Sequence, residues 1–358
     1  MEFLFSNYPP VKTRCKTFVD TFYMLLPQTS RLDIAVGYVS ADSLLELKRI
    51  LELNENISEL NLIVGMHYFE CFTKVQYKAT LLLNEYLKSC KKGKVKLVTA
   101  FKYHGKLFSF SGEDGPFAGI IGSNNLSSII ETGTRVYESS FLINDKEHTL
   151  QMQAFVEELS KNASRNISEL EIETFIQANP VLEGHESVTK IPTAKLIEIG
   201  NKLSKVIFEI PTKATPKSNL NCYHGKGREN TRTRVVKPRH WYEVELIVPI
   251  DIRKSKNYPK GSPKGEKDTE FTVYTDDGFC FKCQVNGGEE GLWNKNLRSS
   301  RDLTILGKWI KGRLENEGVL VVGDVVTEKT LKEYGRNTIT MTKIDGTDDW
   351  FLDFGVKK

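Results

Sequence analysis

The chain has 358 residues and a formal net charge of only +4, with 27% charged, 39% hydrophobic and 10% aromatic residues. This composition is typical of a globular protein and excludes a fibrous or intrinsically disordered chain. No apolar run approaches the roughly 18 residues of a membrane span, and the first residues lack the pattern of a signal peptide. The six cysteines indicate reduced thiols, so we expect a cytoplasmic protein of about two domains.

The positive charge is concentrated in one window. Lys and Arg exceed Asp and Glu by nine in residues 201–260, whereas residues 1–200 sum to −3 and residues 261–358 to −2. A local excess of this size attracts polyanions whatever the overall balance is. The window is therefore a candidate nucleic-acid interface.

The first half of the chain alternates between two patterns. Short apolar runs predict strands at 32–39, 60–66, 94–100, 106–110, 117–122 and 136–143, and amphipathic stretches predict helices at 41–53, 73–90 and 146–162. Buried strands that alternate with amphipathic helices are typical of an α/β domain. We expect a mostly parallel sheet that helices cover on both faces.

The second half changes character. After a loop-like, basic stretch at 211–240, the pattern predicts helices at 303–317 and 328–335, and strands at 241–250, 270–275, 279–285, 318–326, 337–344 and 350–356. Asp277-Gly278 between two alternating runs is a strong hairpin signal. We divide the chain into an α/β domain at 1–165, a helical connector at 166–205 and a β-rich barrel or sandwich at 206–358.

Two short motifs fall at strand ends of the first domain. HGK at 104–106 opens one expected strand, and GSNN at 122–125 ends the next. Alternation along a strand places His104 and Lys106 on one face. A histidine can attack phosphorus while a second histidine protonates the leaving oxygen, and lysine and amide donors stabilise the developing charge. Glu138 is placed to hydrogen-bond the imidazole and fix its tautomer.

His104, Lys106, Ser123 and Asn125 resemble the HxK…GSxN signature of the phospholipase D superfamily. That superfamily often has Asp five positions after the lysine, where this chain has Ser111. Its nuclease branch often lacks that Asp, so the resemblance favours DNA cleavage over lipid chemistry. One copy of the full signature is present, because a second HGK at 224–226 has no GSxN after it and indicates chance or DNA contact. The resemblance thus implies a homodimer that shares one active site.

Residues 271–326 resemble the B3-type DNA-binding pseudobarrel, in which two arms enter the major groove. Arg and Asn can read base edges there. The two arms would carry Arg253, Lys254, Lys256 and Lys260 in the first, and Trp293, Asn294, Lys295, Asn296 and Arg298 in the second. A neighbouring basic set is expected to neutralise phosphates: Lys226, Arg228, Arg232, Arg234, Lys237 and Arg239.

The combination resembles restriction endonucleases of the BfiI kind, and most closely the restriction subunits of the NgoAVII and CglI systems. It implies an α/β phospholipase-D-like domain, with a mixed or parallel sheet between helices, followed by a β-rich B3-like pseudobarrel. It also implies type II-like, sequence-specific cleavage of double-stranded DNA through a phosphohistidine on His104, without a divalent metal or other cofactor. The implied partners are an ATPase or helicase-like subunit and a DNA methyltransferase. This chain has no Walker A motif, so ATP would act only through a partner.

Two other functions fit the same residues. One is a dimeric, sequence-specific DNA-binding regulator whose N-terminal domain is inactive. The other is a non-specific nuclease of the phospholipase D family. We expect no metal site, because the thiols of Cys280 and Cys283, three positions apart on a strand, point to opposite faces.

Overall fold

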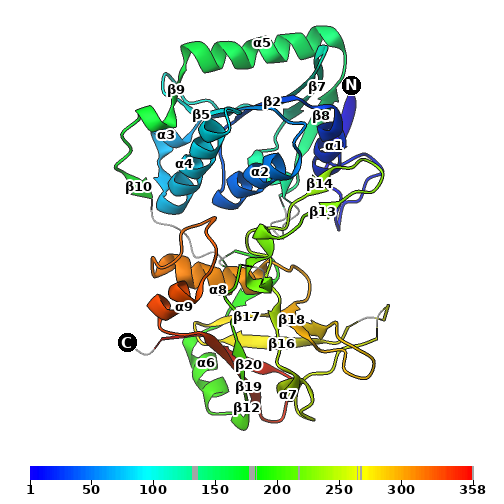
Figure 1. Cartoon of the computed structure of the whole chain (residues 1–358), viewed down its shortest axis with the longest axis vertical. Coiled ribbons are helices and arrows are strands. Elements are labelled where there is room, and N and C mark those ends of the chain that lie inside the picture. The colour runs from blue at the N-terminus through cyan, green and yellow to red at the C-terminus, as the bar shows by residue number, and fades with distance from the viewer. Residues whose placement is uncertain are drawn as a thin grey trace. The chain divides into compact units, whose positions relative to one another are not determined.

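The computed structural model describes residues 1–130, 136–176, 182, 184–216, 218–263, 265–266 and 268–356. These residues form two compact units, each with its own sheet and core (Figure 1). The first unit holds the described residues up to 176 together with 227–238. The second unit holds the other described residues.

The described residues of the first unit form an eight-stranded sheet in the order β1–β8–β7–β6–β2–β3–β5–β9. Its strands are β1 (Glu2–Phe5), β2 (Arg31–Val36), β3 (Glu59–Val64), β5 (Gly93–Val98), β6 (Lys106–Gly112), β7 (Gly115–Gly122), β8 (Ser139–Ile143) and β9 (Ser164–Asn166). A separate two-stranded sheet pairs β4 (Phe72–Thr73) with β10 (Phe175–Ile176).

The sheet is mixed, as the resemblance implied as one of two possibilities, and the mostly parallel sheet expected from the alternating pattern was wrong. Only the β2–β3 and β3–β5 pairs of this sheet are parallel among the described strands, and its other pairs are antiparallel. Parallel neighbours need a long crossover such as a helix, whereas β6 and β7 are joined by a tight turn and must run in opposite directions. Apolar runs predict strands but not their direction.

Helices cover both faces of the sheet. Helix α5 (Lys146–Asn162) lies along one face, and α2 (Ala41–Leu53) and α4 (Lys74–Ser89) lie on the other (Figure 1). Ser40 and Thr73 cap the start of α2 and α4 as capping boxes. In each box the cap side chain accepts the backbone N–H of the third helical residue, and the side chain of that residue accepts the backbone N–H of the cap. A further helix, α1 (Phe18–Leu25), packs Phe22 against the aromatic rings of β6.

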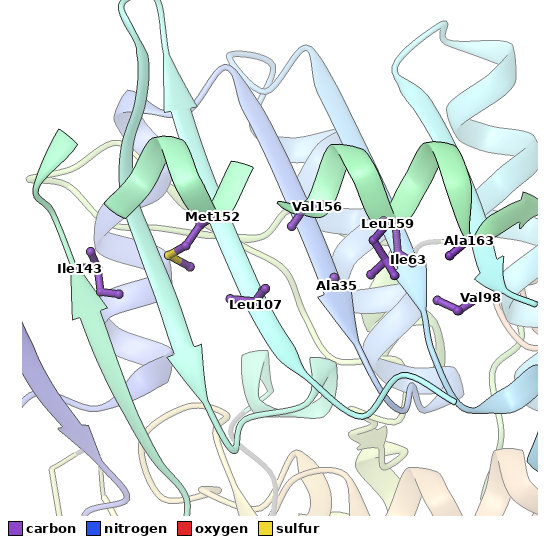
Figure 2. Packing of buried hydrophobic residues seen from close by; sticks show 9 residues of the cluster. All are labelled: Ala35, Ile63, Val98, Leu107, Ile143, Met152, Val156, Leu159 and Ala163. Carbon is purple, nitrogen blue, oxygen red and sulfur yellow. The ribbon is translucent and has the colours of Figure 1, made fainter. Parts of the chain in front are cut away.

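The inner side of α5 is apolar and meets small and branched residues of the sheet. Met152 and Val156 of α5 point at the strands, where Ala35 and Leu107 lie (Figure 2). All four side chains are less than a tenth exposed. This layer fixes the face of β6 on which Leu107 lies, and therefore the direction of Lys106 at the start of the strand.

The described residues of the second unit form a sheet in the order β12–β19–β20–β16–β17–β18–β15, and β11 also pairs with β17. Its strands are β11 (Val188–Lys190), β12 (Leu203–Pro211), β15 (Leu246–Ile247), β16 (Glu270–Thr275), β17 (Phe279–Asn286), β18 (Asn296–Ser299), β19 (Thr338–Ile344) and β20 (Trp350–Asp353). Its helices are α6 (Thr193–Gly200), α7 (Ile250–Arg253), α8 (Ile305–Asn316) and α9 (Glu328–Tyr334). The Asp277-Gly278 hairpin joins β16 to β17 as expected, and Gly278 has the positive φ of +83° that such a turn needs.

Three expectations for the second half were wrong. The connector at 166–205 is not a run of helices: α6 is its only α-helix among the described residues, and 177–181 and 183 lie outside the description. The apolar run 241–250 contributes only the short strand β15, and 318–326 forms no strand within the described range. Trp241 and Val244 are nonetheless 1% and 0% exposed, so the part of the run before β15 fills the core without joining a ladder. Apolar runs report burial more reliably than strand pairing.

A short hairpin from the second half belongs to the first unit. Its strands are β13 (Arg228–Glu229) and β14 (Val236–Lys237), which lie in the stretch expected to be part of the barrel. Asn54, at the end of α2, donates to the backbone oxygen of Val236 at 2.9 Å and accepts from its N–H at 2.8 Å. The division of the structure therefore differs from the one drawn on the sequence.

Candidate active site

His104 lies just before β6, on an exposed loop beside the ends of β2 and β3. Gly37, which follows β2, approaches the imidazole so closely that a Cβ there would lie 3.0 Å from Cδ2 of His104. A glycine at this position therefore lets the β2 loop pack against the histidine. The exposed imidazole is accessible to a large substrate.

Lys106 is the first residue of β6 and is only 8% exposed. Its Nζ donates to the backbone oxygen of His104 at 2.6 Å. Burial lowers the pKa of Lys106, and the carboxylate of Glu138 acts against that shift. The lysine is thus a fixed cation directly behind the histidine.

The GSNN turn at the end of β7 carries two polar side chains of the candidate site, Ser123 and Asn125, in the same unit as His104. Ser123 is exposed, its Oγ accepts the backbone N–H of Ser139 at 3.0 Å, and its hydroxyl donates to the carboxylate of Glu138. Asn125 accepts the backbone N–H of Tyr38 on Oδ1 at 3.2 Å. Because Oδ1 is engaged, the Nδ2 group is the end of Asn125 that is left to donate to a substrate.

The expected hydrogen bond from Glu138 to His104 is absent from the described residues. Glu138 instead accepts the hydroxyl of Ser123, and its backbone N–H donates to Ser6 Oγ at 2.9 Å. The reason is the position of Glu138, which comes directly before β8, the strand paired with β7. That pairing sets Glu138 beside the GSNN turn.

Sequence reasoning missed three residues around His104. The ring of Tyr38 meets the imidazole edge-on with centroids 5.6 Å apart, and its hydroxyl donates to Glu70 Oε2 at 2.5 Å. His67 is 5% exposed, and burial lowers its pKa. Glu70 and His67 belong to α3 (His67–Glu70), which follows β3. The usable signal was topological, because loops that follow adjacent parallel strands lie at the same edge of a sheet.

The second HGK, at 224–226, is not a copy of the site. His224 ends a short 3-10 helix, η4 (Asn219–His224), of the second unit, and its ring meets Trp241 edge-on at 6.2 Å. No strand begins at Lys226, which is an exposed residue. The histidine is therefore part of the aromatic packing there.

The residues expected to contact phosphates lie mostly on the hairpin of the first unit. Arg228, Arg232 and Arg234 are exposed, and Arg234 is paired with Glu229 at 2.9 Å. Lys237 lies 5.0 Å from the ring centroid of Tyr23. Arg239 begins the next part of the second unit, where it pairs with Glu243 at 2.6 Å. The set is thus divided between the two units.

Three of the residues expected to read bases are structural. Arg253 is 9% exposed and donates to the backbone oxygen of Leu292 at 2.9 Å, while the 3% exposed Asn294 donates to the backbone oxygens of Arg253 and Pro259, each at 3.1 Å. Arg298 pairs with Glu245 at 3.2 Å.

The other expected base readers lie at the surface. Trp293 and Asn296 are partly exposed, and the exposed members are Lys254, Lys256, Lys260 and Lys295. The two expected arms are therefore joined by buried polar contacts, and their lysines are exposed.

Within the part of the chain that the structure describes, no group of three or more His, Cys, Asp or Glu side chains is placed to hold a metal ion. Cys283 is fully buried and Cys280 is partly exposed, on opposite faces of β17. None of the described helices is both long and apolar enough to span a bilayer.

The fold and motifs define a phospholipase-D-like domain joined to a B3-like DNA-binding domain. The model of the NgoFVII restriction endonuclease N-terminal PLD domain matches residues 16–172, and that of the NgoFVII C-terminal B3-like DNA-binding domain matches residues 198–345. The chain belongs to this family of restriction endonucleases with a phospholipase-D-type domain and a B3-like domain. The first model is that of a nuclease domain, and the second is that of a DNA-binding domain.

The other comparisons add little. Among solved structures, a phosphatidylserine synthase from Haemophilus influenzae Rd KW20 is 18% identical, with a TM-score of 0.34. The match covers 48% of this chain and 41% of that one, so this chain spans less than half the length of that protein. No curated protein sequence matches the chain.

Proposed function

We propose that the chain is the nuclease subunit of a cytoplasmic restriction system, and that it cleaves double-stranded DNA when its B3-like domain binds a specific sequence. The observation that carries this proposal is the exposed His104 directly in front of the buried cation of Lys106. A nucleophile must be accessible, whereas a cation that stabilises charge gains strength from a site that excludes water.

The proposed reaction has two displacements at phosphorus. A ring nitrogen of His104 forms a bond to phosphorus as the P–O bond between that phosphate and the released end of the DNA strand breaks. A second histidine gives its proton to the leaving oxygen. Water then attacks the phosphohistidine as it loses a proton to the second histidine, the P–N bond breaks, and the imidazole of His104 is restored. Lys106 and the Nδ2 group of Asn125 would stabilise the charge on the non-bridging oxygens, and the Ser123 hydroxyl would add a donor. In this mechanism the lysine and amide donors stabilise the charge that a divalent metal often stabilises in other nucleases. We therefore propose that cleavage needs no divalent metal.

We propose that the second histidine comes from a second copy of the chain. The complete HxK…GSxN signature occurs once in the sequence, at His104 and at Asn125. Beside Lys106 lies a mainly apolar groove of about 610 Å³. Its wall includes Ile121 and Phe155, which are 41% and 47% exposed. Apolar side chains this exposed beside a site are suited to burial between two protomers, and a two-fold dimer would bring two histidines together.

Other proteins would hydrolyse ATP and methylate the DNA. No Walker A motif is present in the chain, so we propose that any ATP dependence comes from an ATPase or helicase-like subunit. A cognate DNA methyltransferase would protect the host sequence. Co-purification of an ATPase with the tagged chain, and ATP-stimulated cutting in the mixture, would support this part.

The test is cleavage of plasmid DNA in EDTA by the full chain and by His104→Ala. We expect the wild-type protein to linearise a plasmid that carries the target sequence and the variant to be inactive. Acid-labile phosphate trapped on His104 would support the covalent step. Nicking at random positions would favour a non-specific nuclease. Sequence-specific binding with no cutting, even with an ATPase subunit added, would favour a DNA-binding regulator.

A further inference from the structure

Tyr38 contacts both halves of the candidate site. It follows β2, its backbone N–H donates to Asn125 Oδ1 at 3.2 Å, and its ring meets the His104 imidazole at an interplanar angle of 79°. Within the described residues, no side-chain hydrogen bond links His104 or Lys106 to Ser123 or Asn125. Tyr38 therefore contacts one residue of each motif, His104 with its ring and the Asn125 side chain with its backbone N–H.

Tyr38 is itself held from two sides. Its ring meets the ring of His67 edge-on with centroids 5.5 Å apart. The His67 ring is locked in turn, because it accepts the N–H of Val39 on Nε2 at 3.2 Å and donates from Nδ1 to the backbone oxygen of Cys71 at 3.0 Å. On the other side, the Tyr38 hydroxyl donates to Glu70. A ring fixed in this way offers His104 one defined surface.

Glu70 is an exposed carboxylate with two donors. The hydroxyl of Tyr38 and Lys102 Nζ, at 3.1 Å, both bind it, and these contacts lower the pKa of Glu70. The charge of His104 acts in the same direction. Glu70 thus remains ionised near the histidine and ties the loops after β2 and β3 to the loop that carries His104.

We propose that Tyr38 is a positioning residue that sets the ring plane of His104 and orients the side chain of Asn125, with Glu70 as its anchor. This inference rests on the proposed function. The in-line attack of an imidazole on phosphorus depends on the ring plane, and a displacement of about 1 Å can cost on the order of 100-fold in rate. Tyr38 would act on kcat, because its ring touches the imidazole of the nucleophile.

The kinetic test compares Tyr38→Leu, Tyr38→Phe and Glu70→Gln in plasmid cleavage. We expect Tyr38→Leu to lower kcat by about 10- to 100-fold while KM changes by less than about threefold. Tyr38→Phe keeps the ring and breaks only the bond to Glu70, so it and Glu70→Gln should each lower kcat by about three- to tenfold. The double variant Tyr38→Phe/Glu70→Gln should be no slower than the slower single variant, because both changes remove one bond.

The controls are Tyr86→Phe and Glu85→Gln on α4, which should keep the wild-type rate. A wild-type kcat in Tyr38→Leu, or a change in KM alone, would overturn the proposal. If Tyr38→Leu does not fold, as judged by thermal unfolding, the other two variants decide. Wild-type kcat in both Tyr38→Phe and Glu70→Gln would then overturn it.

A second measurement does not depend on cleavage. Diethyl pyrocarbonate acylates accessible imidazoles, and mass spectrometry gives the rate at His104 relative to His148, whose side chain is 52% exposed. We expect Tyr38→Leu to change this ratio, because the imidazole loses the ring against which it packs. An unchanged ratio overturns the positioning role. A changed ratio in a protein that never cuts DNA supports the positioning role and overturns the proposed function alone.

Discussion

The side chain of Asn54 holds both polar groups of the Val236 backbone, 182 positions further along the chain. Asn54 is only 6% exposed, and the facing Gly227 has no room for a Cβ, which would lie 2.9 Å from Leu53. The contact anchors the basic hairpin to α2. Residues 227–238 of the positive window are thereby part of the phospholipase-D-like unit.

Asn54→Ala should release this hairpin. Two backbone groups would lose their partners, at a cost of about 1–3 kcal/mol, and the loss should be local because the hairpin lies at the edge of the unit. Hydrogen–deuterium exchange should show faster exchange at 228–237 and unchanged exchange in β2 and β3. Asn162→Ala, on the exposed end of α5, is the control. Unchanged exchange in the hairpin would contradict the anchor.

Asn294→Ala should destabilise the second unit. The change leaves the backbone oxygens of Arg253 and Pro259 without their donor, and we expect a loss of about 2–3 kcal/mol in the free energy of unfolding in urea. Lys295→Ala, an exposed neighbour, should stay within about 0.5 kcal/mol of the wild type and weaken DNA binding. Asn294→Ala with wild-type stability and altered sequence preference would instead make Asn294 a base reader.

Lys311 should make the second unit more stable at alkaline pH. It is fully buried on α8, donates to the backbone oxygen of Trp241 at 2.6 Å, and burial lowers its pKa from 10.5 to about 7 against the opposing effect of Glu315. Between these two values the unfolded chain binds the proton that the folded chain has released. The free energy of unfolding should therefore rise with pH, by up to about 1.4 kcal/mol per unit.

Urea unfolding from pH 7 to about 10 measures this slope. Lys311→Met, of similar length and without a charge, should remove the slope, whereas the exposed Lys329→Met should keep it. Equal slopes in the wild type and Lys311→Met would show that other groups cause the pH dependence.

Lys106→Ala should abolish most of the cleavage. Removing a buried cation behind the nucleophile is expected to lower kcat by about 100- to 1000-fold. It also leaves the backbone oxygen of His104 without its donor. Lys161→Ala on α5 serves as the matched control in the plasmid assay. A Lys106→Ala protein that cuts at the wild-type rate would remove Lys106 from the mechanism.

The sequence was sufficient for the elements that local pattern defines. Helices α2 and α5 and strand β16 begin and end where periodicity predicts, because their caps and alternation are encoded within a few residues. The sequence pattern failed for most of 241–250, where only Leu246 and Ile247 are paired in a strand and residues 241–244 before them are buried without strand pairing. The sequence pattern also failed to predict the direction of the strands, which depends on the connections between elements.

By itself the sequence determined the two motifs around His104 and Asn125, and with them the class of protein, because their chemistry is written in residue type and short spacing. Only the tertiary structure decided that Glu138 binds Ser123, that Tyr38 joins the two motifs, and that the basic hairpin packs on α2. Each of these is a contact between distant segments, and a contact of that kind depends on how the sheet brings strand ends together. The same reason separates the structural Arg253 from the exposed lysines beside it, since burial is a property of the fold and not of the residue.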